Sequence, residues 1–317
     1  MHKYIAKRLL YSLIILLLVI LIVFIVVRLI PGDPIRATMQ QNIDLTDQKI
    51  VEEVRSQYGL NKPIHIQFCD WLWDLLRGNW GRSLQTGDTV LSMFWQRFPI
   101  TLELFAGATF WAWIIGFPLG VLSALKKNSF IDVSLTSIAL IGVSIPSFWE
   151  GILFIYLFSV YFRILPPSGF SHFFEDPWLH FESLIMPTFV MGTHTAGLLG
   201  RYVRSSLLEV LNQDYIRTAV AKGLPRRVVI QKHAGRPTMV PVATVISLSW
   251  GHFLAGAFLV EYIFAIPGLG RMGVEAIFAR DFPVIQATLM MVAVNVLLVN
   301  LAVDIFYGFL DPRIRLY

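Results

Sequence analysis

The chain has 317 residues, of which 56% are hydrophobic and only 15% are charged. Soluble domains average about 45–50% apolar and about 25% charged residues, so this composition excludes an ordinary soluble fold and favours a membrane protein. The formal net charge of +5 does not indicate a nucleic-acid partner, because 15 of the 26 Lys and Arg residues fall in segments predicted to lie on one side of a membrane. The single cysteine, Cys69, excludes an intramolecular disulfide and a cysteine-based metal site.

The first apolar segment, residues 9–30, is long enough to cross a bilayer. At about 1.5 Å per residue its helix measures roughly 33 Å, against a hydrocarbon core of about 30 Å. The segment exceeds the roughly 7–15 apolar residues of a signal peptide, and Arg28–Pro34 offers no small-x-small cleavage motif. We therefore predict that residues 1–30 form an N-terminal tail and a retained first transmembrane helix.

Hydropathy predicts five further spans, so the expected fold class is an all-α integral membrane protein with six transmembrane helices. Pro146 lies inside the third span and frees a backbone carbonyl, which predicts a bend there. Six spans place both termini on one side, and basic residues near both ends predict a multi-pass protein of the cytoplasmic (inner) membrane with both termini cytoplasmic. The approximate spans are 9–30, 101–125, 132–162, 183–203, 239–261 and 284–310.

The connections between spans divide the chain unequally. Residues 31–100 are predicted to be a long external segment that opens with a turn at Pro31–Pro34 and carries a short amphipathic helix over 45–58. Residues 101–310 form a five-helix core, and residues 311–317 a cytoplasmic tail.

The largest cytoplasmic connection, residues 201–238, is strongly basic and contains a predicted short helix. Asn212 or Asp214 is the expected N-cap, Tyr215–Lys222 the body, and Gly223 the C′ residue, with Pro225 just beyond. Tyr215, Ala219 and Lys222 are predicted to share one face. The small Ala and Gly residues there allow another protein to approach closely.

The run Asp214–Gly223 resembles the cytoplasmic signature of ABC-importer permeases, in the form found in the dipeptide, oligopeptide and nickel transport family, first-permease branch. Other family-like motifs follow in order along nearly the whole chain: Arg28–Pro34, Tyr58–Pro63 with Gln67, Gly78–Ser83, Ser144–Phe148, Glu261–Gly270, Arg280–Pro283, Asn300–Asp304 and Asp311–Arg315. Two positions depart from the family pattern. Val220 stands where a basic residue is common, and Ala234–Pro237 puts the length of any helix beyond His233 in question.

The resemblance implies a permease subunit whose coupling helix docks on an ATPase. Ala219 and Gly223 would be the signature small residues, with Tyr215, Arg217 and Lys222 beside them. The implied partners are a second, related permease, two ABC ATPases and an external substrate-binding protein, which residues 31–100 would contact. No Gly-x-x-x-x-Gly-Lys-[Ser/Thr] motif occurs, so ATP and Mg²⁺ are expected on the partner ATPases, with no cofactor, metal site or catalytic residue in this chain.

Polar residues inside the spans are candidates for the translocation path, because burying them in lipid is costly. Glu150 could meet a substrate's ammonium group or a metal, with Pro146 and Ser147 beside it, or it could hydrogen-bond to a neighbouring helix. Both interpretations remain open. Glu103 and Glu261 are expected near water at the outer ends of their spans. His194 and His252 are more simply explained as hydrogen-bonded core histidines than as metal ligands.

Import of short peptides is the expected function, with nickel or another metal chelate, glutathione or small oligosaccharides as alternative cargoes. A self-contained channel or ion-coupled carrier is the alternative of a different class. It should show inverted repeats or matching broken spans, and the sequence shows neither. A membrane enzyme should carry a motif such as His-Glu-x-x-His or Gly-x-Ser-x-Gly, and neither occurs.

Overall fold

The computed structural model describes residues 2–29, 61–235, 237–239, 242–243, 249 and 257–310, with the backbone alone for residues 2–6 and 302–310. The regular elements of these residues are helices, apart from an isolated antiparallel bridge between Arg82 and Thr89, so the all-α prediction is confirmed for them. Several predicted features lie outside the described residues: the Pro31–Pro34 turn, the 45–58 helix, most of the 239–261 span and the 311–317 tail.

Packing divides the chain into two compact units. The first comprises Met1–Ile100 and Pro267–Leu301, and the second comprises Thr101–Ile266 and Ala302–Tyr317. The predicted division into an external segment and a 101–310 core follows membrane topology, which packing alone does not test. It stays a prediction.

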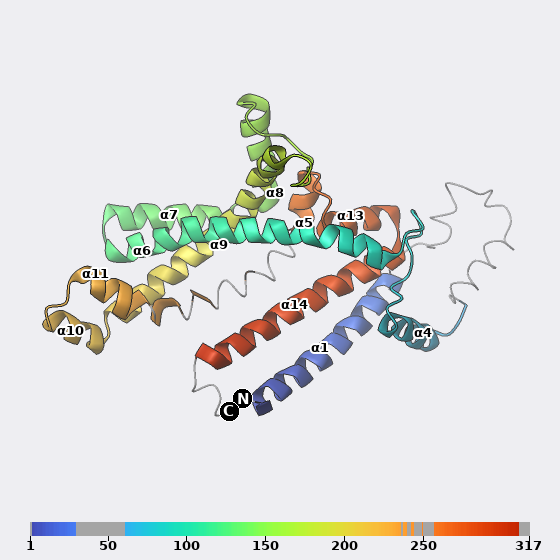
Figure 1. Cartoon of the computed structure of the whole chain (residues 1–317), viewed down its shortest axis with the longest axis horizontal. Coiled ribbons are helices and arrows are strands. Elements are labelled where there is room, and N and C mark those ends of the chain that lie inside the picture. Colours follow the sequence, from blue (N-terminus) through green and yellow to red (C-terminus); the bar gives the residue numbers. More distant parts are fainter. Residues whose placement is uncertain are drawn as a thin grey trace. The chain divides into compact units, whose positions relative to one another are not determined.

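The first unit is built on α1 (His2–Leu29) and α14 (Phe282–Leu310), which lie side by side in Figure 1. Val23 and Val27 of α1 share a buried cluster with residues of α13 (Leu269–Ala279) and α14. Phe24, also on α1, packs against α4 (Ile64–Leu76), where its ring centroid lies 5.1 Å from that of Phe68.

Asp281 fixes a turn within the same unit. Its buried carboxylate accepts a hydrogen bond from the Ser83 hydroxyl at 2.5 Å and another from the Leu84 amide at 3.2 Å. Two of the family-like motifs, Gly78–Ser83 and Arg280–Pro283, therefore meet in space, although 198 positions separate the bonded residues.

The second unit is organised around α9 (Pro177–Leu211), a 35-residue helix with buried residues along its whole length. The helix begins at Asp176, whose carboxylate accepts a hydrogen bond from the Leu179 amide at 3.0 Å. Its main packing partners are the π-helical turn η1 (Ala112–Gly116), α6 (Phe117–Leu125) and α7 (Phe130–Ser144). At Gly116 the backbones approach closely, and a Cβ atom there would lie 2.5 Å from the Ala196 carbonyl oxygen.

The predicted third span is broken. The helical stretch Phe130–Ser144 and the stretch Ser147–Tyr161, which contains α8 (Ser147–Phe154) and η2 (Ile155–Tyr161), meet at 99°. Figure 1 shows α8 turning away from the direction of α7. The predicted bend at Pro146 is therefore confirmed.

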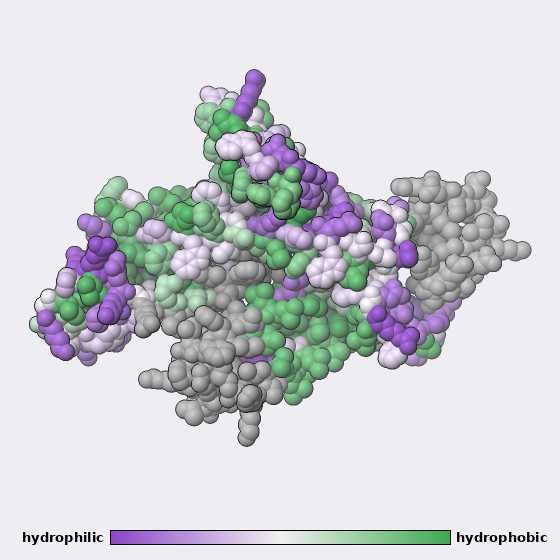
Figure 2. Space-filling view, viewed as in Figure 1, coloured by the Kyte–Doolittle hydropathy of each residue, from purple (hydrophilic) through white to green (hydrophobic). Residues whose placement is uncertain are grey.

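Three described helical stretches are long and apolar enough to cross a membrane, and the bent pair adds a fourth if it forms one span. These stretches are Lys7–Leu29, Val90–Leu125 and Phe282–Leu301. The Val90–Leu125 stretch begins eleven positions before the predicted 101–125 span, because α5 (Val90–Trp111) starts ahead of its most apolar part. Many large apolar side chains of α1 are exposed, and Figure 2 shows apolar surface in this region, as expected for contact with lipid.

Candidate functional site

The predicted short helix in the basic connection is α10 (Asp214–Ala221). It begins one position away from either expected cap: Gln213 is the N-cap, with an extended backbone whose carbonyl accepts from the amides of Ile216 and Arg217 at 3.1 and 3.3 Å. Asn212 instead ends α9 and donates its side-chain amide to Leu208, and Asp214 is the first helical residue. The predicted N-caps were wrong because α9 extends to Leu211, well beyond the predicted span, and leaves only two residues before α10.

The end of α10 follows the sequence prediction. Gly223 has a φ of +75°, a left-handed conformation that glycine adopts without strain. Its amide donates to the Val220 carbonyl at 2.9 Å, and the Leu224 amide donates to Ala219 at 3.4 Å, which together make a Schellman cap. Gly223 at C′ is therefore confirmed, and Pro225 then caps α11 (Arg226–Val228).

One face of α10 is buried within this chain. Ile216 and Ala219 are 4% and 5% exposed. They pack in a cluster with residues of α6, α9, and the helical turn η3 (Val229–Ala234): Ala124, Leu207, Val210, Val229 and Ala234.

This packing corrects the predicted face, because Ala219 is buried whereas Tyr215 and Lys222 are exposed. The small side chain of Ala219 lets α10 approach other helices of its own chain, and its role toward an ATPase stays a prediction. Tyr215 was predicted to share a face with Ala219, yet it is 46% exposed. The buried stripe of α10 is centred between Ile216 and Ala219, which leaves Tyr215 at its edge.

The exposed side of α10 is polar and basic. Arg217, Lys222 and Val220 all lie on the surface there, and Val220 provides an apolar spot 60% exposed. Arg217 lies 3.4 Å from the Asp214 carboxylate, but this exposed pair leaves both groups in water. Figure 2 shows a mainly hydrophilic surface over α10 and α11. The helix thus offers a small, rigidly capped, positively charged surface.

Glu150 lies at the break between α7 and α8. It sits in the first turn of α8, after the exposed Pro146 and the half-buried Ser147, and is itself buried. The Thr193 hydroxyl on α9 lies 2.8 Å from its Oε2 atom, within hydrogen-bonding distance. The structure thus shows the tie to a neighbouring helix that was one of two interpretations of Glu150. The tie also places Glu150 beside the bend.

Two other predicted polar positions differ from each other in the structure. Glu261 is fully buried and accepts a hydrogen bond from the Thr101 hydroxyl at 2.8 Å, so the expectation that it lies near water was wrong. Glu103 is partly exposed, with a carboxylate oxygen 3.8 Å from Nε2 of His180. Hydropathy placed Glu261 at a span end, but it could not show that another helix covers that position.

The described part of the chain contains no group of three or more His, Cys, Asp or Glu side chains that could hold a metal ion. His194 lies half-buried on α9 and interacts with another group. His252 lies outside the described residues.

The sequence prediction missed a partly buried ion pair near α10. Asp132, on the first turn of α7, accepts from Nε and a terminal nitrogen of Arg204 on α9, both at 2.8 Å. The Asp132 carboxylate raises the pKa of the Arg204 guanidinium above its ordinary value, chiefly through this hydrogen bonding. One half of the pair had a sequence signal, since Ser129 and Asp132 have the spacing of a helix-capping box. The Ser129 hydroxyl indeed accepts from the Asp132 amide at 3.3 Å.

Comparison of the sequence with known proteins identifies a family. The profile described as "Binding-protein-dependent transport system inner membrane component" matches residues 116–316, and the profile of its N-terminal part matches residues 1–105. A probable peptide ABC transporter permease of Sinorhizobium fredii is 38% identical, over 99% of this chain and all of its own. The di/tripeptide permease DppB of Pseudomonas aeruginosa is 40% identical, over 92% of each chain. The oligopeptide permease AppB of Bacillus subtilis is 39% identical, over 99% of this chain and all of its own.

A solved structure shares the fold. A chain of the MetNI methionine ABC transporter, in an inward-facing conformation, matches with a TM-score of 0.56 and 18% identity. The match covers 76% of this chain and 98% of that chain.

Proposed function

The chain belongs to the family of binding-protein-dependent transport system inner membrane components, and from this premise we propose that it forms half of the translocation path of an ATP-driven importer of short peptides. The observation that carries the proposal is the match to peptide permeases from three bacterial genera over more than nine tenths of the chain.

The proposed topology has six transmembrane helices and both termini in the cytoplasm. Its support is the set of three long apolar helices, the bent pair and the clustering of basic residues in segments 1–8, 201–238 and 311–317. The 183–203 span falls within α9, and the 239–261 span fills the stretch that the structure leaves largely undescribed.

We assign α10 as the coupling helix that meets an ATPase subunit. Its support is physical: a helix with a glycine cap at its C-terminal end and one buried face cannot rotate freely, so a force on its exposed face is passed to α9. Tyr215, Arg217 and Lys222 form the contacting side, and Gly223 sets where the helix ends. Ala219 supports the helix from behind.

The proposed assembly contains a second permease, two ATPases and an external binding protein, in contact with the lipid bilayer. ATP and Mg²⁺ bind to the ATPases, so this subunit contributes movement and a path but no chemistry. Glu150, Pro146 and Ser147 are assigned to the path, because a buried carboxylate at a helix break is placed to meet a cationic group of a cargo.

The test is purification of the chain from its native membrane with its partners, followed by uptake in proteoliposomes. Two ATPases and a second permease should co-purify, and ATP should drive uptake of labelled alanyl-alanine. Unlabelled dipeptides should compete, whereas nickel, glutathione and a small oligosaccharide should not. Competition by one of those cargoes instead would transfer the proposal to it. Purification of the chain alone, with ATP-independent flux, would contradict an importer and favour a channel or carrier.

A further inference from the structure

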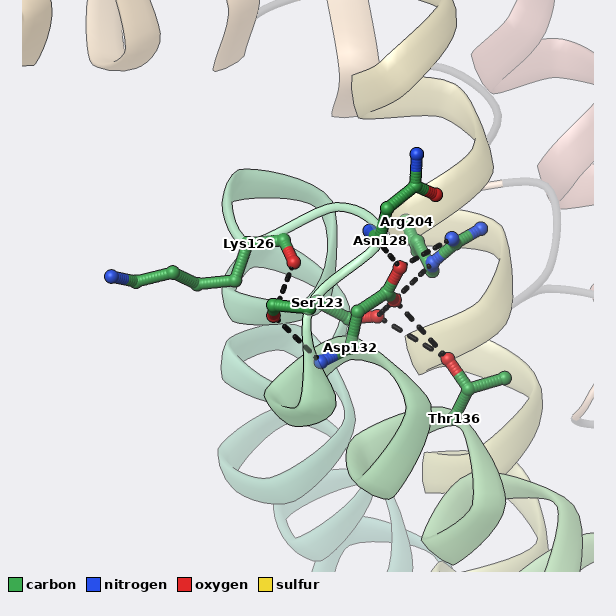
Figure 3. Close-up of polar contacts among 7 residues, drawn as sticks. Ser123, Lys126, Asn128, Asp132, Thr136 and Arg204 are labelled. Carbon is green, nitrogen blue, oxygen red and sulfur yellow. Dashed lines mark hydrogen bonds and ion pairs between the residues drawn. The ribbon is translucent and has the colours of Figure 1, made fainter.

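The α6–α7 turn is closed around the Asp132 carboxylate. The Ser123 hydroxyl of α6 donates to Oδ1, and the Asn128 amide of the turn donates to Oδ2 at 3.0 Å. Asn128 has a φ of +61°, so the backbone is held in a left-handed conformation with its amide directed at the carboxylate. Figure 3 shows the groups that surround Asp132: Ser123, Asn128, Thr136 and Arg204.

Arg204 brings α9 into this cluster. Nε and one terminal nitrogen of Arg204 donate hydrogen bonds to the two carboxylate oxygens of Asp132, a residue 72 positions earlier in the chain. The Asp132 side chain is 6% exposed and that of Arg204 30% exposed. Because removing charges from water is costly, an ion pair with its carboxylate buried is weak evidence for stability and is better explained by the geometry that it specifies.

The pair ties the first half of the broken helix, α7, to α9 close to the residues that pack against α10. On one side, Leu207 lies one turn beyond Arg204 on α9 and belongs to the cluster that buries Ile216 and Ala219 of α10. Ala124, adjacent to Ser123 on α6, belongs to the same cluster. A displacement of α10 therefore reaches both α6 and α9 close to the Asp132–Arg204 pair.

On the other side, α9 meets the broken helix a second time. Thr193 precedes Arg204 by 11 positions, roughly 16 Å along the helix, and its hydroxyl lies within hydrogen-bonding distance of Glu150 beyond the break. The helix α9 is thus joined to the first turn of α7 through Asp132 and to α8 through Glu150. Loss of the first join would remove the charged tie between the start of α7 and α9.

We propose that Asp132 and Arg204 are a positioning pair that makes α6, α7 and α9 move together with α10, so that the energy of ATP hydrolysis reaches the helix break. This inference rests on the proposed function of the chain. In this proposal the pair acts by positioning helices and not by touching the cargo or the ATPase. Their effect is on the amount of transport obtained per ATP hydrolysed.

The experiment compares wild type with Arg204→Lys and Asp132→Asn in the assembled transporter, reconstituted in proteoliposomes. Arg204→Lys keeps the charge but loses the two-pronged grip, and Asp132→Asn keeps the shape but loses the charge. Uptake of labelled alanyl-alanine and ATP hydrolysis are measured on the same vesicles. Arg201→Lys is the matched control, because Arg201 is exposed on α9 only three positions away.

We expect both variants to assemble and hydrolyse ATP while uptake per ATP falls roughly 2- to 30-fold, the range for residues on a coupling network. Arg201→Lys should match wild type. The double variant should be no worse than the poorer single variant, because both substitutions break one interaction.

Three results would overturn the inference. The first is wild-type uptake per ATP in both variants. The second is a proportional loss of uptake, hydrolysis and assembly, which would assign the pair a structural role only. The third is a wild-type transporter that moves no peptide, which would remove the proposed function together with the inference, whereas the first two leave the proposed function standing.

Discussion

Gly223 and Ala219 are both small residues near the end of α10, yet they meet different surroundings. Ala219 packs inside the chain, whereas a Cβ atom on Gly223 would find no other atom within 4 Å. The positive φ of Gly223 therefore limits the residue type through backbone strain and not through crowding within this chain. A larger side chain at this position would project into the space that the proposed ATPase fills.

We predict that Gly223→Trp leaves the chain inserted and assembled but uncouples ATP hydrolysis from uptake. The physical reason is a clash at the proposed coupling surface together with a left-handed conformation that Trp adopts poorly. The measurement is peptide uptake and ATP hydrolysis in reconstituted vesicles.

Gly223→Asn is the control for Gly223→Trp, because asparagine tolerates the left-handed conformation and is small. It should retain most of the uptake. Wild-type uptake by Gly223→Trp would remove the role of this loop in coupling. Equal losses in the two variants would assign the effect to something other than side-chain size.

At the scale of elements, local sequence signals predicted helix ends better than helix faces. Gly223 and Pro225 predicted where α10 stops, and Pro146 predicted a bend, because each acts on its own backbone. The angle of 99° depends on what α7 and α8 pack against, so it could not be predicted. The inward direction of Ala219 and the pairing of Asp132 with Arg204 depend on contacts with α9 that a single sequence does not reveal.

The packing of η1 against α9 predicts a sharp response to one added methyl group. In Gly116→Ala the new Cβ atom would lie 2.5 Å from the Ala196 carbonyl oxygen and 3.0 Å from its Cα, and backbone atoms cannot move aside as a side chain does. We expect Gly116→Ala to destabilise the unit by about 1–3 kcal/mol through overpacking. The thermal unfolding midpoint of the detergent-purified protein measures the effect.

Gly142→Ala is the matched control for this substitution. Gly142 is also helical, on α7, but its Cβ atom would be 3.4 Å from the nearest atom, an ordinary contact. It should unfold at the wild-type temperature or above, because alanine favours a helix over glycine by about 1 kcal/mol. An unchanged midpoint for Gly116→Ala would show that α9 and η1 are less closely packed than described.

At the scale of the whole molecule, the sequence predicts membrane topology from charge and hydropathy, and packing describes something else. Residues 267–301 pack in the same unit as the first hundred residues. Hydropathy instead divides them between an external loop and the last span, which is predicted to begin at residue 284. Distance along the chain could not predict this grouping, because contacts such as that of Ser83 with Asp281 join residues that are far apart in the sequence. Topology therefore needs a measurement that reports the side of the membrane directly.

The single cysteine supplies that measurement. Cys69 is exposed on α4, within the segment predicted to be external. We predict that a membrane-impermeant maleimide labels Cys69 in right-side-out spheroplasts, because charge bias places residues 31–100 outside.

A cysteine on the opposite side completes the topology test. In a Cys69→Ser chain, Lys127→Cys should be labelled only after permeabilisation, since Lys127 is exposed in the α6–α7 turn on the predicted cytoplasmic side. Labelling after denaturation sets the maximum for each protein. The reverse pattern would invert the topology. It would also place α10 outside, because the predicted cytoplasmic location of α10 rests on the same charge bias, and a cytoplasmic ATPase could then not reach it. Labelling of both sites in intact spheroplasts would contradict the number of spans between residues 69 and 127.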